Sequence, residues 1–383
     1  MPLEHAHAAT PAGKSRARAI GVPFAGTPGH RNAITDVPGV EVGYTTLIQG
    51  DGPLVVGRGP VRTGVTAILP RGKAGVMDPV FAGSHDLNGW GELTGTHRIE
   101  AAGLCGGPIL ITNSMSVGVV RDAAARWLAE GRDPERLMDL MGLGMRVVGE
   151  TYDGKLNNIV GQHVRPEHVV SAIEGAKGGP LELGSVGGGT GMIAYQFKGG
   201  SGSASRVAET AAGRYTVGVF AQANHGRRSD LIVAGLPVGR ELGGRELGGP
   251  AVAPSERGSI IAVVATDAPL LPSQLRRIAQ RFGLGLARTG AIARNGSGDM
   301  FLAVSTANPG TLAATDGLRR ADFLHDVHID PLFEATVQAA EEAVIDAMVA
   351  NAAMTGRDGF TVPALPLDRL ADILRRHGRL AAP

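Results

Sequence analysis

Three short polar segments contain residue types that nucleophilic catalysis uses. Ser259 follows a glycine at the start of an apolar run, and the segment Asn295-Gly-Ser-Gly-Asp299 places Ser297 two residues before a carboxyl group. Asn224 lies in Gln222-Ala-Asn-His-Gly226, at the end of another apolar run. A serine hydroxyl is a weak nucleophile that needs a base, and an amide donor can stabilise a developing negative charge. Taken alone, each segment is more typical of a turn or the start of a strand, so the three matter only as a set.

Other common signatures are missing from the sequence. It has no HExxH motif, no Walker A loop, no GxGxxG after a strand and no GxSxG elbow. The segment Gly187-Gly-Gly-Thr-Gly191 could hold an anion, but a turn between strands is the better interpretation. His325 and His328 have a spacing that could hold a metal, although a solvated loop fits better. We therefore expect no metal and no organic cofactor.

Composition bounds the class of protein. The 383 residues include 37 Lys and Arg against 36 Asp and Glu, a net charge of +1, which argues against a nucleic-acid surface. The single cysteine, Cys105, allows no disulfide within the chain. Apolar runs are far shorter than the roughly 20 residues of a membrane span, and no secretory signal is evident. The expectation is a soluble cytoplasmic protein with no membrane partner.

Apolar runs alternate with segments of helical spacing, which predicts an α/β or α+β class. Residues 1–25 are expected to form a loose tail and 26–383 a single domain, with a flexible linker at 239–258 that contains a tandem Gly-Arg-Glu-Leu-Gly repeat. On the longest helix, Glu341 and Glu342 are expected to face outward. Strands are predicted at 64–70, 108–112, 145–149, 216–221, 259–266 and 301–306, and helices at 119–131, 272–282, 332–353 and 367–380.

Several longer segments occur in a fixed order along the chain. They are Val147-Val-Gly-Glu-Thr-Tyr-Asp-Gly154, Ala221-Gln-Ala-Asn-His-Gly226, Gly258-Ser-Ile-Ile-Ala-Val-Val-Ala-Thr-Asp-Ala-Pro-Leu-Leu-Pro272, Asn295-Gly-Ser-Gly-Asp-Met-Phe-Leu-Ala-Val-Ser-Thr306, and Asp330-Pro-Leu-Phe-Glu-Ala-Thr-Val-Gln-Ala-Ala-Glu-Glu-Ala343. Together they resemble the DmpA-type family of L-aminopeptidase/D-esterase-amidase enzymes, which includes the β-peptidyl aminopeptidases. The resemblance extends from about residue 21 to residue 351.

The resemblance implies a precursor that cuts itself between Gly258 and Ser259. The products would be an α chain of residues 1–258 and a β chain of residues 259–383, with Ser259 as the nucleophile at the new N-terminus. Physical chemistry supports this placement, because a free α-amine has a pKa of about 7.7–8.0 and can act as the base for its own hydroxyl. Gly258 also has no Cβ to block attack on its carbonyl.

Further site roles follow from the resemblance, residue by residue. Ser297 and Asp299 match a serine and an acidic residue that bond around the nucleophile; the acidic position is Glu in some members. Asn224 matches the amide of the oxyanion hole, and Tyr152 matches a tyrosine near the scissile carbonyl. Glu150 matches the carboxylate that binds the free ammonium of the substrate, which would explain aminopeptidase specificity.

The fold that the resemblance implies is a four-layer αββα sandwich, and the expected assembly is a homotetramer of αβ units. The expected substrates are amides, esters or short peptides with a small free N-terminal residue, of the L-α, D-α or β type. Trp90 stands in a segment that resembles the pocket-lining loop of the family, so selectivity could differ. Two alternatives stay open: an acyltransferase of the ornithine-acetyltransferase type, against which a Ser rather than a Thr at position 259 argues, and a silent scaffold or binding protein.

Overall fold

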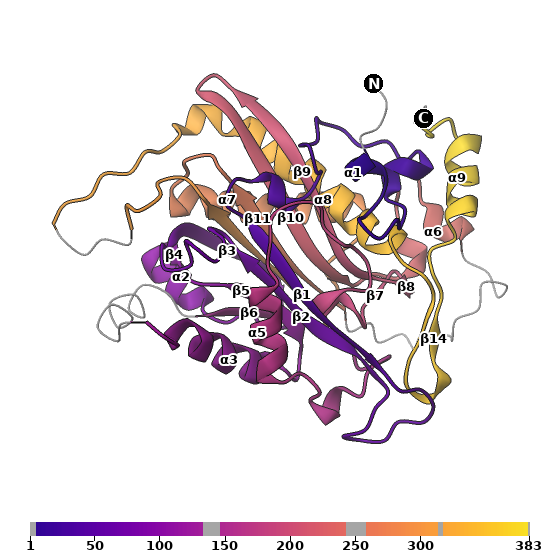
Figure 1. The fold of residues 1–383 in the computed structure, drawn as a ribbon. Helices are drawn as coiled ribbons and strands as arrows, with labels where there is room; N and C mark the ends of the chain where they lie inside the picture. Colours follow the sequence, from indigo (N-terminus) through magenta and orange to yellow (C-terminus); the bar gives the residue numbers. More distant parts are fainter. Residues whose placement is uncertain (1–4, 133–145, 243–257, 313–316, 382–383) are drawn as a thin grey trace.

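Two main β-sheets form the centre of the computed structural model, which describes residues 5–132, 146–242, 258–312 and 317–381. Figure 1 shows their strands side by side, with helices outside them. The smaller sheet has the order β1-β2-β5-β6, formed by Glu41–Gln49, Val61–Leu69, Ile109–Asn113 and Val147–Thr151. The larger has the order β4-β3-β12-β11-β10-β9, formed by Leu104–Cys105, Val80–Gly89, Gly298–Ser305, Ser259–Thr266, Gly213–Asn224 and Gly200–Thr210.

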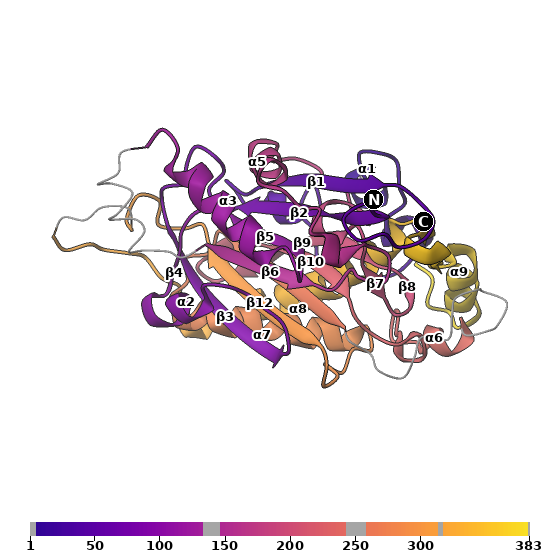
Figure 2. The same cartoon turned by 90° about the horizontal axis from the view of Figure 1, so that it is seen from below.

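Helices cover the outer face of each sheet, which gives four layers (Figure 2). The buried residues of α3 (Val117–Ala129) and α5 (Pro166–Glu174) pack on the smaller sheet, and those of α7 (Pro272–Arg288) and α8 (Asp330–Val349) pack on the larger one. A third apolar cluster fills the space between the two sheets. The predicted αββα sandwich is therefore confirmed. The shorter elements are α1 (His5–Ala8), α2 (Thr96–Ala102), α6 (Val238–Glu241), α9 (Leu367–Arg376), β7 (Ile193–Ala194), β8 (Phe197–Lys198), β13 (Met354–Thr355) and β14 (Thr361–Val362).

The central strand β11 shows why its sequence is apolar without interruption. All eight of its residues are buried. Successive side chains on a strand point to opposite faces, and both faces of this strand are covered. Alternate residues therefore enter different clusters: Ile260, Ala262 and Val264 pack toward the helices, and Ile261, Val263 and Ala265 pack between the sheets.

The long helix α8 is packed closely against the larger sheet, and it buries one glutamate that the sequence analysis expected at the surface. Its close packing on β9 depends on Gly202, because a Cβ there would lie 1.9 Å from the carbonyl oxygen of Ala343. Glu341 lies near the surface, but Glu342 is completely buried. The prediction of an outward-facing Glu342 was wrong, since this carboxylate has buried cationic partners.

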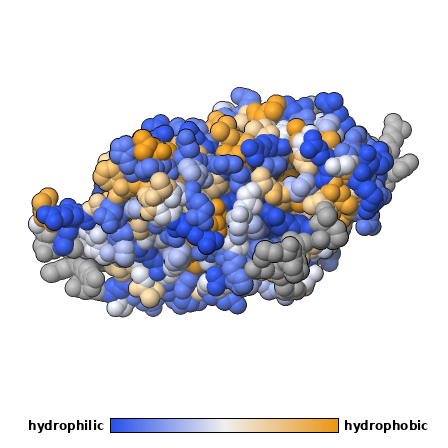
Figure 3. Space-filling view, turned by 90° about the horizontal axis from the view of Figure 1, so that it is seen from above, coloured by the Kyte–Doolittle hydropathy of each residue, from blue (hydrophilic) through white to orange (hydrophobic). Residues whose placement is uncertain are grey.

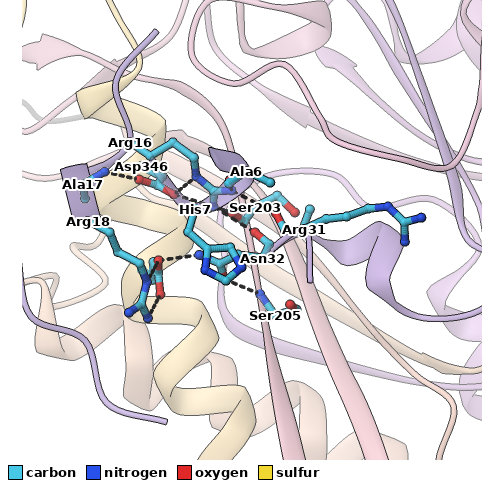
Figure 4. Close-up of polar contacts among 12 residues, drawn as sticks. Ala6, His7, Arg16, Ala17, Arg18, Arg31, Asn32, Ser203, Ser205 and Asp346 are labelled. Atoms are coloured by element: carbon cyan, nitrogen blue, oxygen red, sulfur yellow. Dashed lines mark hydrogen bonds and ion pairs between the residues drawn. The ribbon is translucent and has the colours of Figure 1, made fainter. Parts of the chain in front are cut away.

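Those partners come partly from the segment predicted to be a loose tail, and Figure 4 shows Arg16 and Arg18 of that segment lying against α8. Arg18 donates two hydrogen bonds to Glu342, each of 2.7 Å, and the buried Arg206 of β9 donates another of 2.6 Å. Burial alone would raise the pKa of Glu342, but the two guanidinium groups outweigh it and hold the pKa below its usual value.

Arg16 is the second anchor of the N-terminal segment. Its guanidinium lies 2.7 Å from the carboxylate of Asp346 and also donates to backbone carbonyls that include those of Asn32 and Ser203. The backbone N–H of Ala17 donates to the same carboxylate at 2.7 Å. The described part of the predicted tail is therefore tied to α8 rather than loose. No local pattern could predict this anchoring, because the carboxylates that accept from Arg16 and Arg18 lie more than 300 residues away along the chain.

The predicted linker at 239–258 is described only at its ends. Residues 239–241 belong to α6, and Gly239 and Leu242 are buried rather than solvated. The tandem repeat extends into residues 243–257, which lie outside the described part of the chain. A Cβ at Gly239 would meet the carbonyl oxygen of Arg228 at 1.7 Å, so this glycine is required by packing.

The surface mixes polar and apolar residues. On the face in Figure 3, apolar residues form scattered patches among polar ones. Within the described ranges, every helix is too short or too polar to cross a bilayer.

Candidate active site

Three neighbouring strands of the larger sheet place the predicted site residues together. In the register of β10, β11 and β12, Ser259 pairs with Asn224 on one side and with Gly298 on the other. Ser259 is the first residue of β11, and its side chain is buried at 4% exposure. Because Ser297 and Asp299 flank Gly298, all of these residues lie at the same end of the sheet, where β10 ends and β11 and β12 begin.

The orientation of the Asn224 amide is fixed by its hydrogen bonds. Its Oδ1 accepts from the backbone N–H of Ile193 at 2.9 Å. Its Nδ2 donates to the carbonyl of Tyr152 at 3.0 Å and lies 3.4 Å from Oγ of Ser259. The donor end of the amide therefore faces the serine hydroxyl, as an oxyanion donor must.

Ser297 and Asp299 form a buried pair on either side of Gly298, the strand partner of Ser259. The Ser297 hydroxyl donates to Oδ1 of Asp299 at 2.7 Å, and both residues are buried. A hydroxyl held by a carboxylate is directed and made a better acceptor, so it can receive or pass a proton near Ser259.

The carbonyl of Gly258 has a donor that the sequence analysis did not predict. The backbone N–H of Gly298 donates to this oxygen at 3.2 Å, across the same β11–β12 register. This bond polarises the carbonyl of the Gly258–Ser259 peptide. A backbone donor leaves no side-chain signal in the sequence, although it lies inside the Asn295–Asp299 motif.

His225 is a second residue that the sequence analysis did not single out. Its Cα lies 3.1 Å from where a Cβ on Gly258 would be, and its ring packs edge-on against Tyr195 at 5.1 Å. Burial lowers the pKa of His225 to about 4, so its imidazole is neutral at pH 7. Neither ring nitrogen has a hydrogen-bond partner among the residues that the structure describes. The ring lines a pocket that is also lined by Ser297, Asp299, Gly226, Asp230 and Arg294.

Glu150 contributes a second carboxylate from the smaller sheet. It lies in β6, is mostly buried, accepts from the backbone N–H of Glu92 at 3.1 Å, and accepts a short hydrogen bond from the hydroxyl of Ser114. Burial raises the pKa of Glu150, while the bonds from Ser114 and Glu92 lower it in part. A partly desolvated carboxylate of this kind is suited to an ammonium group.

Gly91 lies between Glu150 and Gly298, the strand partner of Ser259. A Cβ on Gly91 would lie 3.1 Å from both Oε1 of Glu150 and Cα of Gly298. The backbone at Gly91 therefore lies close to Glu150 of the smaller sheet and to Gly298 of the larger one, with little room for a side chain. The neighbouring Trp90 is 70% exposed, at the surface of the predicted pocket-lining loop.

Tyr152 reaches the site through its backbone. Its carbonyl accepts from Asn224, whereas its ring is 40% exposed and lies over Gly154. A catalytic role for its hydroxyl stays a prediction.

The described residues contain no group of three or more metal-ligating side chains. His328 belongs to a short 3-10 helix, Asp326–His328, before α8.

Comparison with known proteins agrees with this geometry. Residues 32–362 match peptidase family S58. The chain belongs to peptidase family S58. It is therefore an enzyme of the serine aminopeptidase class, as the resemblance in its sequence implied, and the scaffold alternative is not supported.

Individual relatives of the S58 chain cover nearly its whole length. It is 50% identical over 378 residues to the beta-peptidyl aminopeptidase BapA of Sphingosinicella microcystinivorans, covering 96% of this chain and 93% of that one. The L-aminopeptidase D-Ala-esterase/amidase of Ochrobactrum anthropi, described as a variant of the Ntn hydrolase fold, is 42% identical with a TM-score of 0.86, covering 96% and 99%. A beta-aminopeptidase of Burkholderia sp. is 46% identical with a TM-score of 0.83, covering 95% and 99%.

The Ser297–Asp299 pair gives a first testable prediction. Asp299→Asn should lower kcat at least about 100-fold, because the carboxylate that directs the Ser297 hydroxyl is lost. Asp267→Asn is the matched control: Asp267 follows the other end of β11 and accepts from the N–H of Thr216 at 2.7 Å. Steady-state hydrolysis of an amino-acid p-nitroanilide measures both. If Asp299→Asn has the same kcat as Asp267→Asn and as the unchanged enzyme, the Ser297–Asp299 pair has no part in the reaction.

Proposed function

We propose that the protein is a self-processing aminopeptidase whose nucleophile is Ser259, released at a new N-terminus by cleavage of the Gly258–Ser259 bond. The observation that supports this most directly is the arrangement at the end of the larger sheet where β10 ends and β11 and β12 begin. There the Ser259 hydroxyl, the Asn224 amide and the Gly258 carbonyl with its Gly298 donor lie together.

The proposed cleavage follows from these contacts. The Ser259 Oγ attacks the Gly258 carbonyl carbon, a C–O bond forms, the C–N bond breaks, and the departing amine takes the hydroxyl proton. The N–H of Gly298 stabilises negative charge on the Gly258 oxygen during this step. The α-amine of Ser259 is free once the C–N bond has broken, and water then hydrolyses the ester, which releases the Ser259 hydroxyl and leaves a carboxylate on Gly258.

The same groups would serve in substrate hydrolysis. The free α-amine, with a pKa near 8, accepts the proton of the Ser259 hydroxyl as it attacks the substrate carbonyl. Asn224 donates to the oxyanion, while Ser297 and Asp299 hold the proton network in place. Water completes the cycle by cleaving the acyl-enzyme ester.

Glu150 is proposed to bind the free ammonium of the substrate. Glu150→Gln should raise KM for free-amine substrates at least about 30-fold, because a buried ammonium loses its counter-charge. In the unchanged enzyme, the same affinity should fall as the pH drops, starting above the usual carboxyl value of 4.5, since burial raises the pKa of Glu150.

The control for Glu150 is its exposed neighbour. Glu92→Gln should change KM less than about threefold, because an exposed charge is screened by water. Self-cleavage, read on a denaturing gel, should continue in both variants. If Glu150→Gln slows self-cleavage as much as turnover, Glu150 shapes the site rather than recognising the amine.

The proposed substrates are peptides or amides with a small free N-terminal residue. Relatives at 50% and 46% identity are named as β-peptidyl aminopeptidases, which favours β-residues at that position. Values of kcat/KM for matched p-nitroanilides of β-alanine, L-alanine and D-alanine test this choice. A strong preference for L-alanine would place the protein with the L-aminopeptidases instead.

The two-chain unit is proposed to assemble further, as a tetramer. Apolar side chains are exposed at Ile48, Val56 and Val160. Their burial between copies would contribute favourably. The native mass in solution tests the assembly.

Self-processing is tested by the intact mass of the purified protein under denaturing conditions. Two species are expected, one beginning at Ser259, whose masses sum to 39.3 kDa plus one water. A single species of 39.3 kDa would contradict self-processing.

A further inference from the structure

Lys198 is a buried cation that the proposed chemistry has not used. It lies in β8, and its Nζ donates to the carbonyls of Met192 at 2.9 Å and Gly199 at 2.7 Å. Among the residues that the structure describes, it has no carboxylate partner. Burying an ammonium without a counter-charge is costly, so such a lysine usually has a function or a dedicated set of acceptors.

The acceptor at Met192 leads directly to the candidate active site. The carbonyl of the Met192–Ile193 peptide receives the Lys198 bond, and the N–H of the same peptide donates to Oδ1 of Asn224 at 2.9 Å. The Nδ2 of Asn224 in turn faces Oγ of Ser259. One continuous row of hydrogen bonds therefore runs from the ammonium through two amide groups to the nucleophile.

Hydrogen bonds in such a row strengthen one another. A cation at a peptide carbonyl draws electrons toward its oxygen through the amide resonance, which makes the N–H of that peptide a stronger donor. The stronger bond then polarises the Asn224 amide in the same way. A more polarised Nδ2–H group stabilises an oxyanion better.

The turn before Lys198 fixes the position of this lysine relative to the Met192–Ile193 peptide. Tyr195 and Gln196 both have positive φ, of 50° and 61°, which joins β7 to β8 in a tight hairpin and sets Lys198 opposite Ile193. Positive φ is unfavourable for residues other than glycine. The buried Tyr195 compensates through a hydroxyl bond of 2.7 Å to Thr289.

We propose that Lys198 is a positioning residue of the hydrolytic site, whose ammonium polarises the Met192–Ile193 peptide and so strengthens Asn224 as an oxyanion donor. The inference rests on the proposed function, because it takes Asn224 as that donor.

The ammonium of Lys198 loses its proton within the pH range in which the activity can be measured. Burial, with a smaller effect of the nearby Lys14, lowers its pKa to about 7. Lys14 itself donates to the carbonyl of Leu183 and lies 3.7 Å from Glu182. A lysine loses its charge as the pH rises through its pKa, so kcat should decline on the alkaline side once Lys198 is neutral.

Lys198→Met is the main test. It should lower kcat about 10-fold to 30-fold, less than the loss of a direct oxyanion donor, with KM within about twofold. The alkaline decline of kcat should disappear. Lys198→Arg keeps a cation at every pH, so it should retain more activity than the methionine variant and also lack the decline. Lys14→Met is the matched control: kcat at its optimum should not change, and the decline should move to higher pH.

A second measurement does not depend on the folding of a Lys198 variant. In Asn224→Ala the row is interrupted while Lys198 stays in place, so the alkaline decline should vanish. If Asn224→Ala leaves kcat unchanged, the proposed role of Asn224 is wrong and this inference falls with it. If Asn224→Ala lowers kcat but keeps the decline, the proposed function stands and the role of Lys198 is overturned.

Discussion

Ser259→Ala is expected to leave one uncut chain of 383 residues with no amidase activity. The variant removes the hydroxyl that is proposed to attack the Gly258 carbonyl, which is also the proposed nucleophile of turnover. The surrounding strand pairs involve the backbone, so the fold should be unaffected. Intact mass under denaturing conditions and hydrolysis of a free-amine p-nitroanilide measure the two losses, each of which should be complete to the limit of detection.

Ser305→Ala is the matched control for this experiment. Ser305 is a buried serine at the opposite end of the adjacent strand β12, where its hydroxyl donates to the carbonyl of Ala268 at 2.6 Å. This variant should be cut and active like the unchanged protein. Cleavage at the same bond in Ser259→Ala would show that another group attacks, and the assignment of the nucleophile would be wrong.

Glu342→Gln should produce the largest loss of stability. The substitution keeps the shape of the side chain but leaves Arg18 and the fully buried Arg206 without their shared counter-charge. Removing one partner of a buried ion pair costs about 3–5 kcal/mol in the free energy of unfolding. That is a large part of the total stability of a typical protein. The measurement is the midpoint of urea unfolding, made in the Ser259→Ala background so that every sample is a single chain.

The neighbouring residue on the same helix provides the comparison. Glu341 pairs with Arg288 at 3.2 Å near the surface, so Glu341→Gln should cost less than about 1 kcal/mol. Equal effects of the two substitutions would show that the buried cluster contributes no more than a surface pair. In the unchanged protein, the contribution of Glu342 should be complete above the ordinary carboxyl pKa. It should be lost as the pH falls through the lowered pKa of the folded state.

The sequence predicted best where one local pattern decides the structure. The helical spacing of Val120, Ala123 and Trp127 predicted α3, and all three residues are buried as expected. The run at 259–266 predicted β11 with its observed bounds. Ser259 and Asn224 were found through motifs, and the strand register explains why residues from distant segments meet.

What the sequence could not predict depends on contacts without a local pattern. The Gly298 amide acts through its backbone, and Lys198 acts through a peptide group, so neither leaves a recognisable signature. The buried state of Glu342 depends on an arginine from the N-terminal segment. A polar N-terminal stretch with basic residues looks the same in sequence whether it is solvated or anchored.

The ion pairs that anchor that N-terminal segment would join two separate chains after the proposed cleavage. Arg16 and Arg18 belong to the proposed α chain, whereas their partners Asp346 and Glu342 belong to the proposed β chain. Cleavage would turn these ion pairs from links within one polypeptide into links between two. Refolding of the precursor is a first-order process, but reassembly of the cut protein would be second order in concentration. The mature enzyme would therefore be held together by contacts that it could form readily only once, before the bond at Ser259 was broken.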